Sequence, residues 1–468
     1  MGISAALGPK LSAKAAIVLP GDSDFARLTA RLREYRAPGI SAVVKVATES
    51  DVQQTVRYAA EHDHPFVARA GGHGATKSLG DAKDAIQIDL RSLDYIKLSE
   101  DGKTAAIGGG ANVKHTVNTL TALGKRTVTG ICESVGISAP ILGGGHGWLQ
   151  GQYGLMADQV VSARLVLSNG DLVTVSKDSN PDLFWAIRGA GHNFGIVTEW
   201  EYRVYDDPAP IWSYEIFTYS GDRLEALYSL ANEKMRDQPP ELIYWARILK
   251  VAEIDAEHPI LWFGIIYNGS PETANEYAKP FHDIGPRSVQ IGQGMMHDLA
   301  VAICCDTDSA NCAYGMTVLR DPIRLKSYNV AAVRQVYDEI DATFRRVPEV
   351  TGSIFLLEGY STQAVQAVNP DSTAFPHRDD KLLITSCIMY EPNAAIDPIA
   401  RELSKKLQKY LLDGSDDPAH LRAYVNYVDD EEPLPAVYGW EDWRLEKLRK
   451  LKSQWDPENR MRFYVPIE

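Results

Sequence analysis

Long hydrophobic runs, an excess of basic residues and internal repeats are all missing from this chain of 468 residues. No apolar stretch approaches the roughly 20 residues that a helix needs to cross a bilayer, so we expect no membrane partner. Lys and Arg number 48 against 62 Asp and Glu, which gives a formal net charge of -14. Because phosphate contacts require a basic surface, this balance argues against a nucleic-acid partner.

Cysteine is also scarce. The chain has five cysteines, and an odd number spread over so long a sequence is not a disulfide framework. Cys304, Cys305 and Cys312 lie close together, but no second Cys/His pair at zinc-binding spacing accompanies them. We therefore interpret them as unligated, partly buried thiols rather than metal ligands, and predict no metal site.

Targeting signals are missing as well. The apolar segment 15–19 is shorter than the hydrophobic region of a signal peptide. Ala6 stands where an N-myristoylation motif requires Ser or Thr. We expect a cytoplasmic protein, an expectation that a removed secretory signal would overturn.

The first 205 residues or so have the pattern of a module of mixed strands and helices. Hydrophobic residues make up 45% of the chain, enough to bury a large core. Residues 41–47 form an apolar, strand-like run, and residues 48–60 follow with a helix-start signal and helical spacing. Segments 160–167 and 170–175 predict a hairpin with its turn at 168–170.

A change in composition marks the end of this module. The doubled proline pattern at 206–210 predicts a domain boundary. From 211 to 415, strands such as 260–267 and 382–390 alternate with helical stretches such as 330–344. The last 50 or so residues are too few for a core of their own, so we expect them to pack against one of the larger units.

Three glycine clusters lie in the first module, at 71–74, 108–110 and 143–147. Each abuts an apolar run, and glycine lets backbone N–H groups approach a phosphate closely. The second cluster lacks the third glycine and the later acidic residue of a dinucleotide-binding Rossmann motif. The three clusters together predict an anionic cofactor held by backbone amides, which suits an acidic chain.

The clusters belong to a longer series of motifs in a fixed order. They are Arg-Ala-Gly-Gly-His-Gly at 69–74, Gly-Ile-Cys-Glu-Ser-Val-Gly-Ile at 130–137, the glycine-rich segment 143–160, Asp-Leu-Phe-Trp-Ala-Ile-Arg-Gly at 182–189 with Gly-Ile-Val at 195–197, and the C-terminal segments 373–378, 424–429 and 456–463. Together they resemble the berberine-bridge-enzyme-like branch of the vanillyl-alcohol-oxidase flavoprotein superfamily. The resemblance covers almost the whole chain.

The resemblance implies an α+β fold in which a PCMH-type FAD-binding domain has two parts. Combined with the boundary near 208, it predicts an FAD-binding domain at 1–207, a substrate domain at 208–415, and a C-terminal segment, 416–468, that returns to the FAD-binding domain. It also implies that the substrate domain is an antiparallel sheet covered by helices, with the flavin ring at the domain junction.

The same resemblance implies where FAD is attached. His73 lies where the family joins a histidine to the flavin 8α-methyl group, and Cys132 lies where bicovalent members join a cysteine sulfur to flavin C6. A thiolate is the nucleophile that the second link requires. The other expected cofactor contacts belong to the matched motifs: Arg69, Ala70, Gly71, Gly72, Gly74, Gly130, Val135, Gly136, Gly143, Gly145, His146, Gly147, Asp158, Gly195, Ile196, Val197 and Asn426. For His146, contact with the flavin and simple solvation both stay open.

Flavin-dependent oxidation also needs a base for the substrate proton. Tyr427 is the first candidate, although it would serve equally well as an aromatic wall of the pocket. Glu358 and Tyr153 are further candidates, for which the alternatives are surface or packing roles.

The predicted function is that of an FAD-linked oxidase. It would move a hydride from a small alcohol, amine or natural-product intermediate to flavin N5, and molecular oxygen would then reoxidise the flavin and yield H2O2. Two alternatives stay open: a dehydrogenase with another electron acceptor, and a flavin-bound, non-redox cyclase or isomerase of secondary metabolism.

Overall fold

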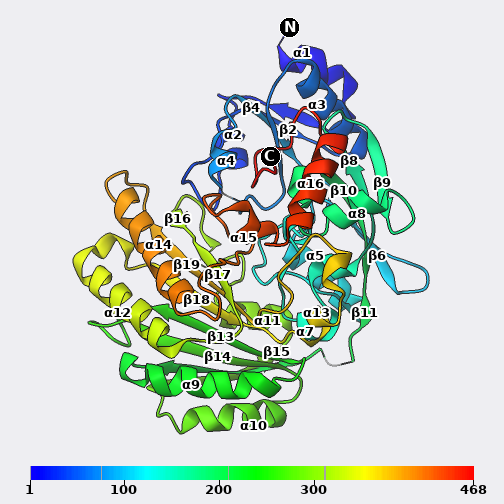
Figure 1. Ribbon diagram of the computed structural model, residues 1–468. Helices are drawn as coiled ribbons and strands as arrows, with labels where there is room; N and C mark the ends of the chain where they lie inside the picture. Colours follow the sequence, from blue (N-terminus) through cyan, green and yellow to red (C-terminus); the bar gives the residue numbers. More distant parts are fainter. Residues whose placement is uncertain (1, 75, 209, 310–311) are drawn as a thin grey trace.

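The computed structural model describes residues 2–74, 76–208, 210–309 and 312–468. Figure 1 shows two parts, one above the other. The upper part contains the N-terminal segments, in blue through cyan to the turquoise-green of β8–β10 and α8, and the C-terminal helix in red. The lower part contains the segments in green to orange. Within the described residues no helix is both long and apolar enough to cross a membrane.

The first sheet of the upper part is mostly parallel. Its strand order is β1-β2-β4-β3, with β1 (Ala16–Val18) antiparallel to β2 (Ile40–Lys45), and with β4 (Ala85–Asp89) parallel to both β2 and β3 (Phe66–Arg69). The expected helix after β2 is α3 (Glu49–Glu61), whose capping box joins Thr48 and Asp51. Val43 and Val44 of β2 are fully buried, as their apolar run predicts.

The second sheet of the upper part is antiparallel. Its strand order is β5 (Ile96–Leu98), β6 (Thr104–Gly108), β10 (Ile196–Arg203), β8 (Val160–Val166) and β9 (Leu172–Ser176). Strands β8 and β9 form the expected hairpin, and its turn places Gly170 at φ +82°, where a side chain is strained. The short strands β7 (Lys125–Arg126) and β11 (Tyr205–Asp206) pair separately. The helices of this part are α1 (Ile3–Leu7), α2 (Phe25–Thr29), α4 (Lys77–Gly80), α5 (Val113–Ala122), α6 (Ser138–Leu142), α7 (Gln150–Tyr153) and α8 (Pro181–Ala186).

The lower part is built on an eight-stranded antiparallel sheet. Its main path is β15 (Ser288–Gly294), β12 (Trp212–Tyr219), β14 (Ile260–Asn268), β13 (Leu242–Leu249), β18 (Ile354–Gly359), β19 (Leu382–Tyr390) and β16 (Thr317–Leu319), and β17 (Pro322–Leu325) also pairs with β19. Strands β14 and β19 match the predicted strands closely. The antiparallel sheet expected for this region is therefore confirmed.

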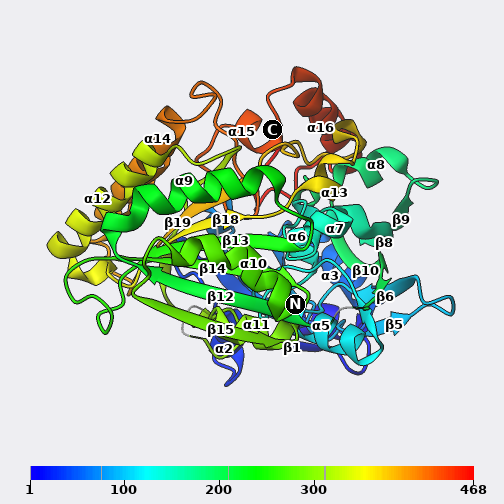
Figure 2. The same cartoon turned by 90° about the horizontal axis from the view of Figure 1, so that it is seen from below.

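The two faces of this sheet have different neighbours because side chains alternate along a strand. Tyr244 and Ala246 point into a core shared with α9 (Leu224–Lys234), α10 (Pro271–His282), α12 (Val330–Arg346) and α14 (Asp397–Asp413). Figure 2 shows α9 and α10 lying across this face. Ile243 and Trp245 point the other way, into a core shared with the upper part. One face is thus covered by helices and the other is turned toward the upper part. Helix α11 (Met296–Ala302) packs against β15, and α13 (Gln363–Gln366) packs against α7.

The C-terminal segment lies against the upper part. After α15 (Leu434–Tyr438), helix α16 (Asp442–Trp455) lies beside α8 (Figure 1). Asn193 holds the end of the chain: its side chain donates to the Val465 carbonyl at 3.1 Å and accepts from the Ile467 amide at 3.0 Å. The α+β architecture is confirmed, whereas the domain limits at 207/208 and 415/416 stay a prediction.

Candidate active site

A cavity of about 400 Å³ lies between the two parts of the molecule. Its upper wall comes from the loop after β3, the loop 130–136, and the tail residues Met461, Phe463 and Tyr464. Its lower wall comes from β13, β18 and β19 and from the segment between α11 and β16. A ligand in this cavity would contact residues from almost the full length of the chain.

Two loops of the upper wall pack so closely that glycine is required. A Cβ on Gly71 would lie 2.6 Å from the Ser134 carbonyl oxygen, and one on Gly136 would lie 2.5 Å from the Cβ of Ala70. Gly72 has φ +80°, a conformation that side chains rarely adopt. The loops 69–74 and 130–136 therefore form one surface.

His73 and Cys132 lie on this surface and share one neighbour. The Ser134 hydroxyl is 2.9 Å from His73 Nε2 and 3.4 Å from Cys132 Sγ. Burial lowers the pKa of His73 to about 3, helped by the nearby charges of Arg320 and Arg69, so the imidazole is neutral at pH 7. A neutral ring keeps a lone pair available for bond formation.

The sulfur of Cys132 has a second sulfur beside it. Cys312 Sγ lies 3.0 Å away. The contact with Cys312 lowers the pKa of Cys132 to about 6, and Ser134 and the charge of Arg320 also favour the thiolate. Cys132 therefore has the ionisation of a reactive rather than an inert cysteine.

Glu358 is a buried carboxyl group held by two phenols. Its side chain is completely buried on β18, and it accepts hydrogen bonds from Tyr427 Oη at 2.9 Å and Tyr360 Oη at 2.5 Å. Burial raises the pKa of Glu358 to about 7, although the two hydroxyls and Arg320 act in the opposite direction. Tyr427 and Tyr360 line the cavity, so they connect this carboxyl group to it.

The pair of Tyr427 and Glu358 has the properties of a proton acceptor. A base works best when its pKa lies near the pH of the reaction, and the raised pKa of Glu358 satisfies that condition. Burial and the neighbouring carboxylate raise the pKa of Tyr427 well above 10, so this phenol stays protonated. It can relay a proton to Glu358 but is not the final proton acceptor. The guanidinium of Arg320 lies 4.9 Å from the centre of the Tyr427 ring.

Most of the cofactor contacts expected from the sequence line this cavity. They are Arg69, Ala70, Gly71, Gly72, His73, Gly74, Gly130, Cys132, Val135, Gly136, His146, Gly195, Ile196 and Asn426. Two atoms of Arg69, Nε and Nη1, find no hydrogen-bond partner within the described parts of the chain. Buried donors of this kind suit an anionic group such as a phosphate.

The glycines of the third cluster lie outside the cavity lining. A Cβ on Gly147 would lie 1.8 Å from the Thr129 carbonyl oxygen, one on Gly145 would lie 2.4 Å from the Cβ of Met156, and one on Gly143 would lie 2.5 Å from the Asn426 side chain. These glycines allow segments to pack closely behind the cavity. Val197 also lies outside the lining, although its neighbour Ile196 is part of it, because the Val197 side chain is buried in the core.

His146 is the member of that cluster that reaches the cavity, and it is buried rather than solvated. Its Nδ1 lies 2.8 Å from Gln150 Oε1 and its Nε2 lies 2.6 Å from Arg324 Nη1. Because arginine can only donate, Nε2 accepts and Nδ1 carries the proton. Burial keeps the pKa of His146 well below its ordinary value.

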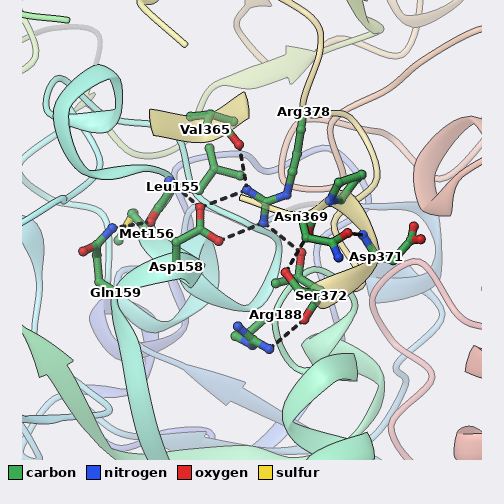
Figure 3. A network of polar contacts seen from close by, with 12 residues as sticks. Leu155, Met156, Asp158, Gln159, Arg188, Val365, Asn369, Asp371, Ser372 and Arg378 are labelled. Atoms are coloured by element: carbon green, nitrogen blue, oxygen red, sulfur yellow. Dashed lines mark hydrogen bonds and ion pairs between the residues drawn. The ribbon is translucent and has the colours of Figure 1, made fainter. Parts of the chain in front are cut away.

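The structure places Asp158 in an ion pair instead of the cavity (Figure 3). Its carboxylate accepts from both terminal nitrogens of Arg378, at 3.0 and 2.8 Å, and from the Leu155 amide at 2.8 Å. Both side chains of the pair are almost completely buried, at 6% and 2% exposure. These contacts join the glycine-rich segment to the segment before β19.

Tyr153 and Glu358 complete the set of predicted residues. The ring of Tyr153 stacks on Tyr205 at 3.8 Å, and its hydroxyl accepts from Arg126 at 2.8 Å, outside the cavity lining. Glu358 also lies outside that lining but reaches it through Tyr427. Of the three candidate bases, the structure brings Tyr427 and Glu358 together and places Tyr153 elsewhere.

Sequence reasoning missed several residues of the site, among them Ser134, Arg320, Trp245 and Tyr360. Arg320 follows β16 without any motif, and Trp245 is one of several aromatic residues on inner strands. A signal for Ser134 did exist, since it lies inside the motif that contains Cys132.

Comparison with known proteins identifies the family of this chain. Residues 40–176 match the family described as FAD binding domain, and residues 423–468 match the family described as berberine and berberine like. The chain is 38% identical over 470 residues to FAD-linked oxidoreductase anuG of Penicillium roqueforti, covering 99% of this chain and 92% of that protein. The chain belongs to the berberine-bridge-enzyme-like FAD-linked oxidoreductases.

Further members of this family are similarly close. FAD-linked oxidoreductase chyH of Penicillium rubens is 38% identical over 98% of this chain and 93% of that protein. The resemblance seen in the sequence is therefore confirmed, and the chain is an FAD-dependent oxidoreductase.

Solved structures show the same fold. BBE-like 1 of Physcomitrella patens has a TM-score of 0.86 at 22% identity, with all of both chains covered. A glucooligosaccharide oxidase of Acremonium strictum, described with a 6-S-cysteinyl, 8α-N1-histidyl FAD, has a TM-score of 0.83 at 20% identity and covers 100% of this chain and 99% of that one. At such identities the likeness shows the fold alone.

Proposed function

We propose that this FAD-linked oxidoreductase is an oxidase that takes a hydride and a proton from a small alcohol, amine or natural-product intermediate and uses molecular oxygen as the electron acceptor. The observation that carries the proposal is the Tyr427–Glu358 pair. It places a carboxyl group of pKa about 7 one hydrogen bond behind a phenol that lines the cavity. Bound FAD supplies the two-electron acceptor for such a reaction.

The described residues fit FAD in three ways. The glycine surface formed by loops 69–74 and 130–136 lets a planar or phosphate group approach the backbone. Arg69 offers two donors without partners in the described structure. His73 and Cys132 share Ser134 as a neighbour, which suits two attachment points on one edge of the flavin ring. We propose both residues as covalent tethers, as named for the glucooligosaccharide oxidase.

The proton route uses the chain's own groups. Tyr427 Oη accepts the substrate's O–H or N–H proton as its own proton passes along the 2.9 Å hydrogen bond to Glu358 Oε1. Tyr360 donates a second hydrogen bond to the carboxylate and fixes its orientation. Arg320, over the Tyr427 ring, stabilises the negative charge that Glu358 carries before it accepts the proton.

The substrate-facing wall is mainly apolar. Trp245, Ile354, Leu356 and Met389 line it from β13, β18 and β19. Such a wall suits an aromatic or aliphatic body whose reacting hydroxyl or amine lies toward Tyr427. This favours a natural-product intermediate among the three substrate classes.

Two measurements test the proposal. Anaerobic mixing with a panel of such substrates should bleach the flavin absorbance, and admitting oxygen should restore it with release of H2O2. Turnover without bleaching or oxygen consumption would indicate the non-redox cyclase instead, and bleaching without reoxidation would indicate a dehydrogenase. Mass spectrometry of the digested protein should find the FAD mass on the peptides that contain His73 and Cys132, whereas loss of all flavin on denaturation would refute both tethers.

A further inference from the structure

Two thiols from distant parts of the chain meet at the wall of the cavity. Cys132 lies in the loop after β7, and Cys312 lies in the segment between α11 and β16, yet their sulfur atoms are 3.0 Å apart. A disulfide bond is about 2.05 Å long, so the two sulfurs need to approach by only about 1 Å to form one.

The segment that carries Cys312 is held against the loops of the upper wall on both sides of this contact. The Glu133 amide donates to the Cys305 carbonyl at 3.0 Å. The Tyr314 hydroxyl donates to the Gly71 carbonyl at 2.8 Å. These bonds keep the two cysteines together without any covalent link.

Peroxide oxidises a thiolate, and the surroundings favour the thiolate at Cys132. The contact with Cys312 lowers the pKa of Cys132 to about 6, with help from Ser134 and Arg320, and the same contact raises the pKa of Cys312. Burial raises the pKa of the neighbouring Cys305 thiol to about 12, which leaves it inert. Oxidants will therefore react at Cys132, with Cys312 as the adjacent resolving thiol.

We propose that Cys132 and Cys312 form a reversible disulfide in every chain whose Cys132 carries no flavin, with hydrogen peroxide as the oxidant. The Cys132 thiolate attacks the peroxide oxygen, which breaks the O–O bond and gives a sulfenic acid and hydroxide. The Cys312 sulfur then displaces hydroxide from that sulfenic acid. In sum, two thiols and one H2O2 give one disulfide and two waters.

This site gives Cys132 two mutually exclusive outcomes. This competition rests on the proposed bond between Cys132 and flavin, because a sulfur bonded to Cys312 cannot also bond to flavin. Formation of the disulfide itself does not depend on that bond. Peroxide is also the product expected of the oxidase. Turnover by chains with flavin bonded to Cys132 would therefore oxidise the chains in which Cys132 carries no flavin. The disulfide would join the two walls of the cavity.

Peptide mapping tests the proposal. The full-length protein is made in cells with limited riboflavin, which enriches chains without flavin on Cys132, and is treated with stoichiometric H2O2. It is then denatured with iodoacetamide and no reductant, and digested. We expect the loss of two free thiols per chain and a Cys132 peptide linked to a Cys312 peptide, both reversed by dithiothreitol. Recovery of Cys132 as sulfinic acid, or joined to another cysteine, would overturn the proposal.

Two variants separate this disulfide from other thiol chemistry. Cys312→Ser should abolish the linked peptide and leave Cys132 to overoxidise, whereas Cys387→Ser, on β19 of the same wall, should behave as the unmodified chain. If Cys312→Ser does not fold, the peptide map of the unmodified chain still shows whether Cys132 and Cys312 form the disulfide. Disulfide formation in a protein whose riboflavin-replete form carries no flavin on Cys132 would refute the tether and leave this inference standing.

Discussion

Replacing Glu358 by Gln should weaken catalysis and strengthen the fold, because one buried carboxyl group is responsible for both effects. Its pKa of about 7 lies above the ordinary value of 4.5, with burial as the main cause. Glutamine keeps the shape and an acceptor for Tyr427 but cannot take up a proton. If Glu358 is the final proton acceptor, kcat should fall by roughly 10²- to 10⁴-fold, the usual contribution of general base catalysis.

The gain in stability follows from the same pKa. For a carboxyl group whose pKa is raised on folding, the favourable contribution of its neutral form is complete below pH 4.5 and is lost as the pH rises through 7. Each pKa unit corresponds to about 1.4 kcal/mol, so ionised Glu358 lowers the free energy of unfolding by about 3 kcal/mol above pH 7. Glu358→Gln should recover about that amount at pH 8 and almost nothing at pH 4.5.

Two assays check this prediction. Urea unfolding followed by tryptophan fluorescence at pH 4.5 and pH 8 compares the stability of the variant with that of the unmodified chain. In the unmodified enzyme kcat/KM should increase as the pH rises through about 7, and this increase should be missing in the variant. Glu257→Gln is the matched control, since its carboxylate is 86% exposed and should change neither result. Glu358 is not the titrating base if the variant and the unmodified chain differ in stability by the same amount at both pH values. The same conclusion follows if kcat/KM of the variant still increases through about pH 7.

Arg320→Met should shift the increase in kcat/KM to higher pH, because the Arg320 cation lowers the pKa of Glu358. Arg320→Lys should return the increase to its original pH, and an unchanged profile in Arg320→Met would contradict this role. Asp158→Asn leaves its buried arginine partner unpaired and should cost about 3–5 kcal/mol in urea unfolding, with the flavin spectrum unchanged if its role is structural. Gly136→Ala places a Cβ 2.5 Å from that of Ala70, so the purified protein should retain much less FAD per chain by absorbance; full retention would refute the close fit of the two loops.

Local sequence signals predicted much of the fold. Strand β2 and helix α3 follow from an apolar run and a capping box that span neighbouring residues. The hairpin of β8 and β9 follows from a turn at 168–170 in which Gly170 takes a positive φ. The order of the strands in the eight-stranded sheet could not be derived in this way, since strand pairing depends on contacts between distant segments. The antiparallel arrangement came from the resemblance to a family.

The candidate site was predictable only where function and sequence motif coincide. His73 and Cys132 stand in recognisable motifs, and both line the cavity. Asp158 stands in a motif too, but its partner Arg378 lies 220 residues along the chain, and no sequence pattern reveals that pair. The glycines at 143–147 show the same limit, because a glycine required by close packing looks like a glycine that approaches a phosphate.

Residues 461–464 help to enclose the cavity, and they are synthesised after the strands of both parts. Met461, Phe463 and Tyr464 reach the ribosome exit only after every strand of both parts has been made, and Asn193 must then capture Val465 and Ile467 to hold them in place. The cavity is therefore enclosed only after residues 461–464 have left the ribosome and docked. A polypeptide halted before residue 461 would contain His73 and Cys132 but would lack this part of the cavity wall.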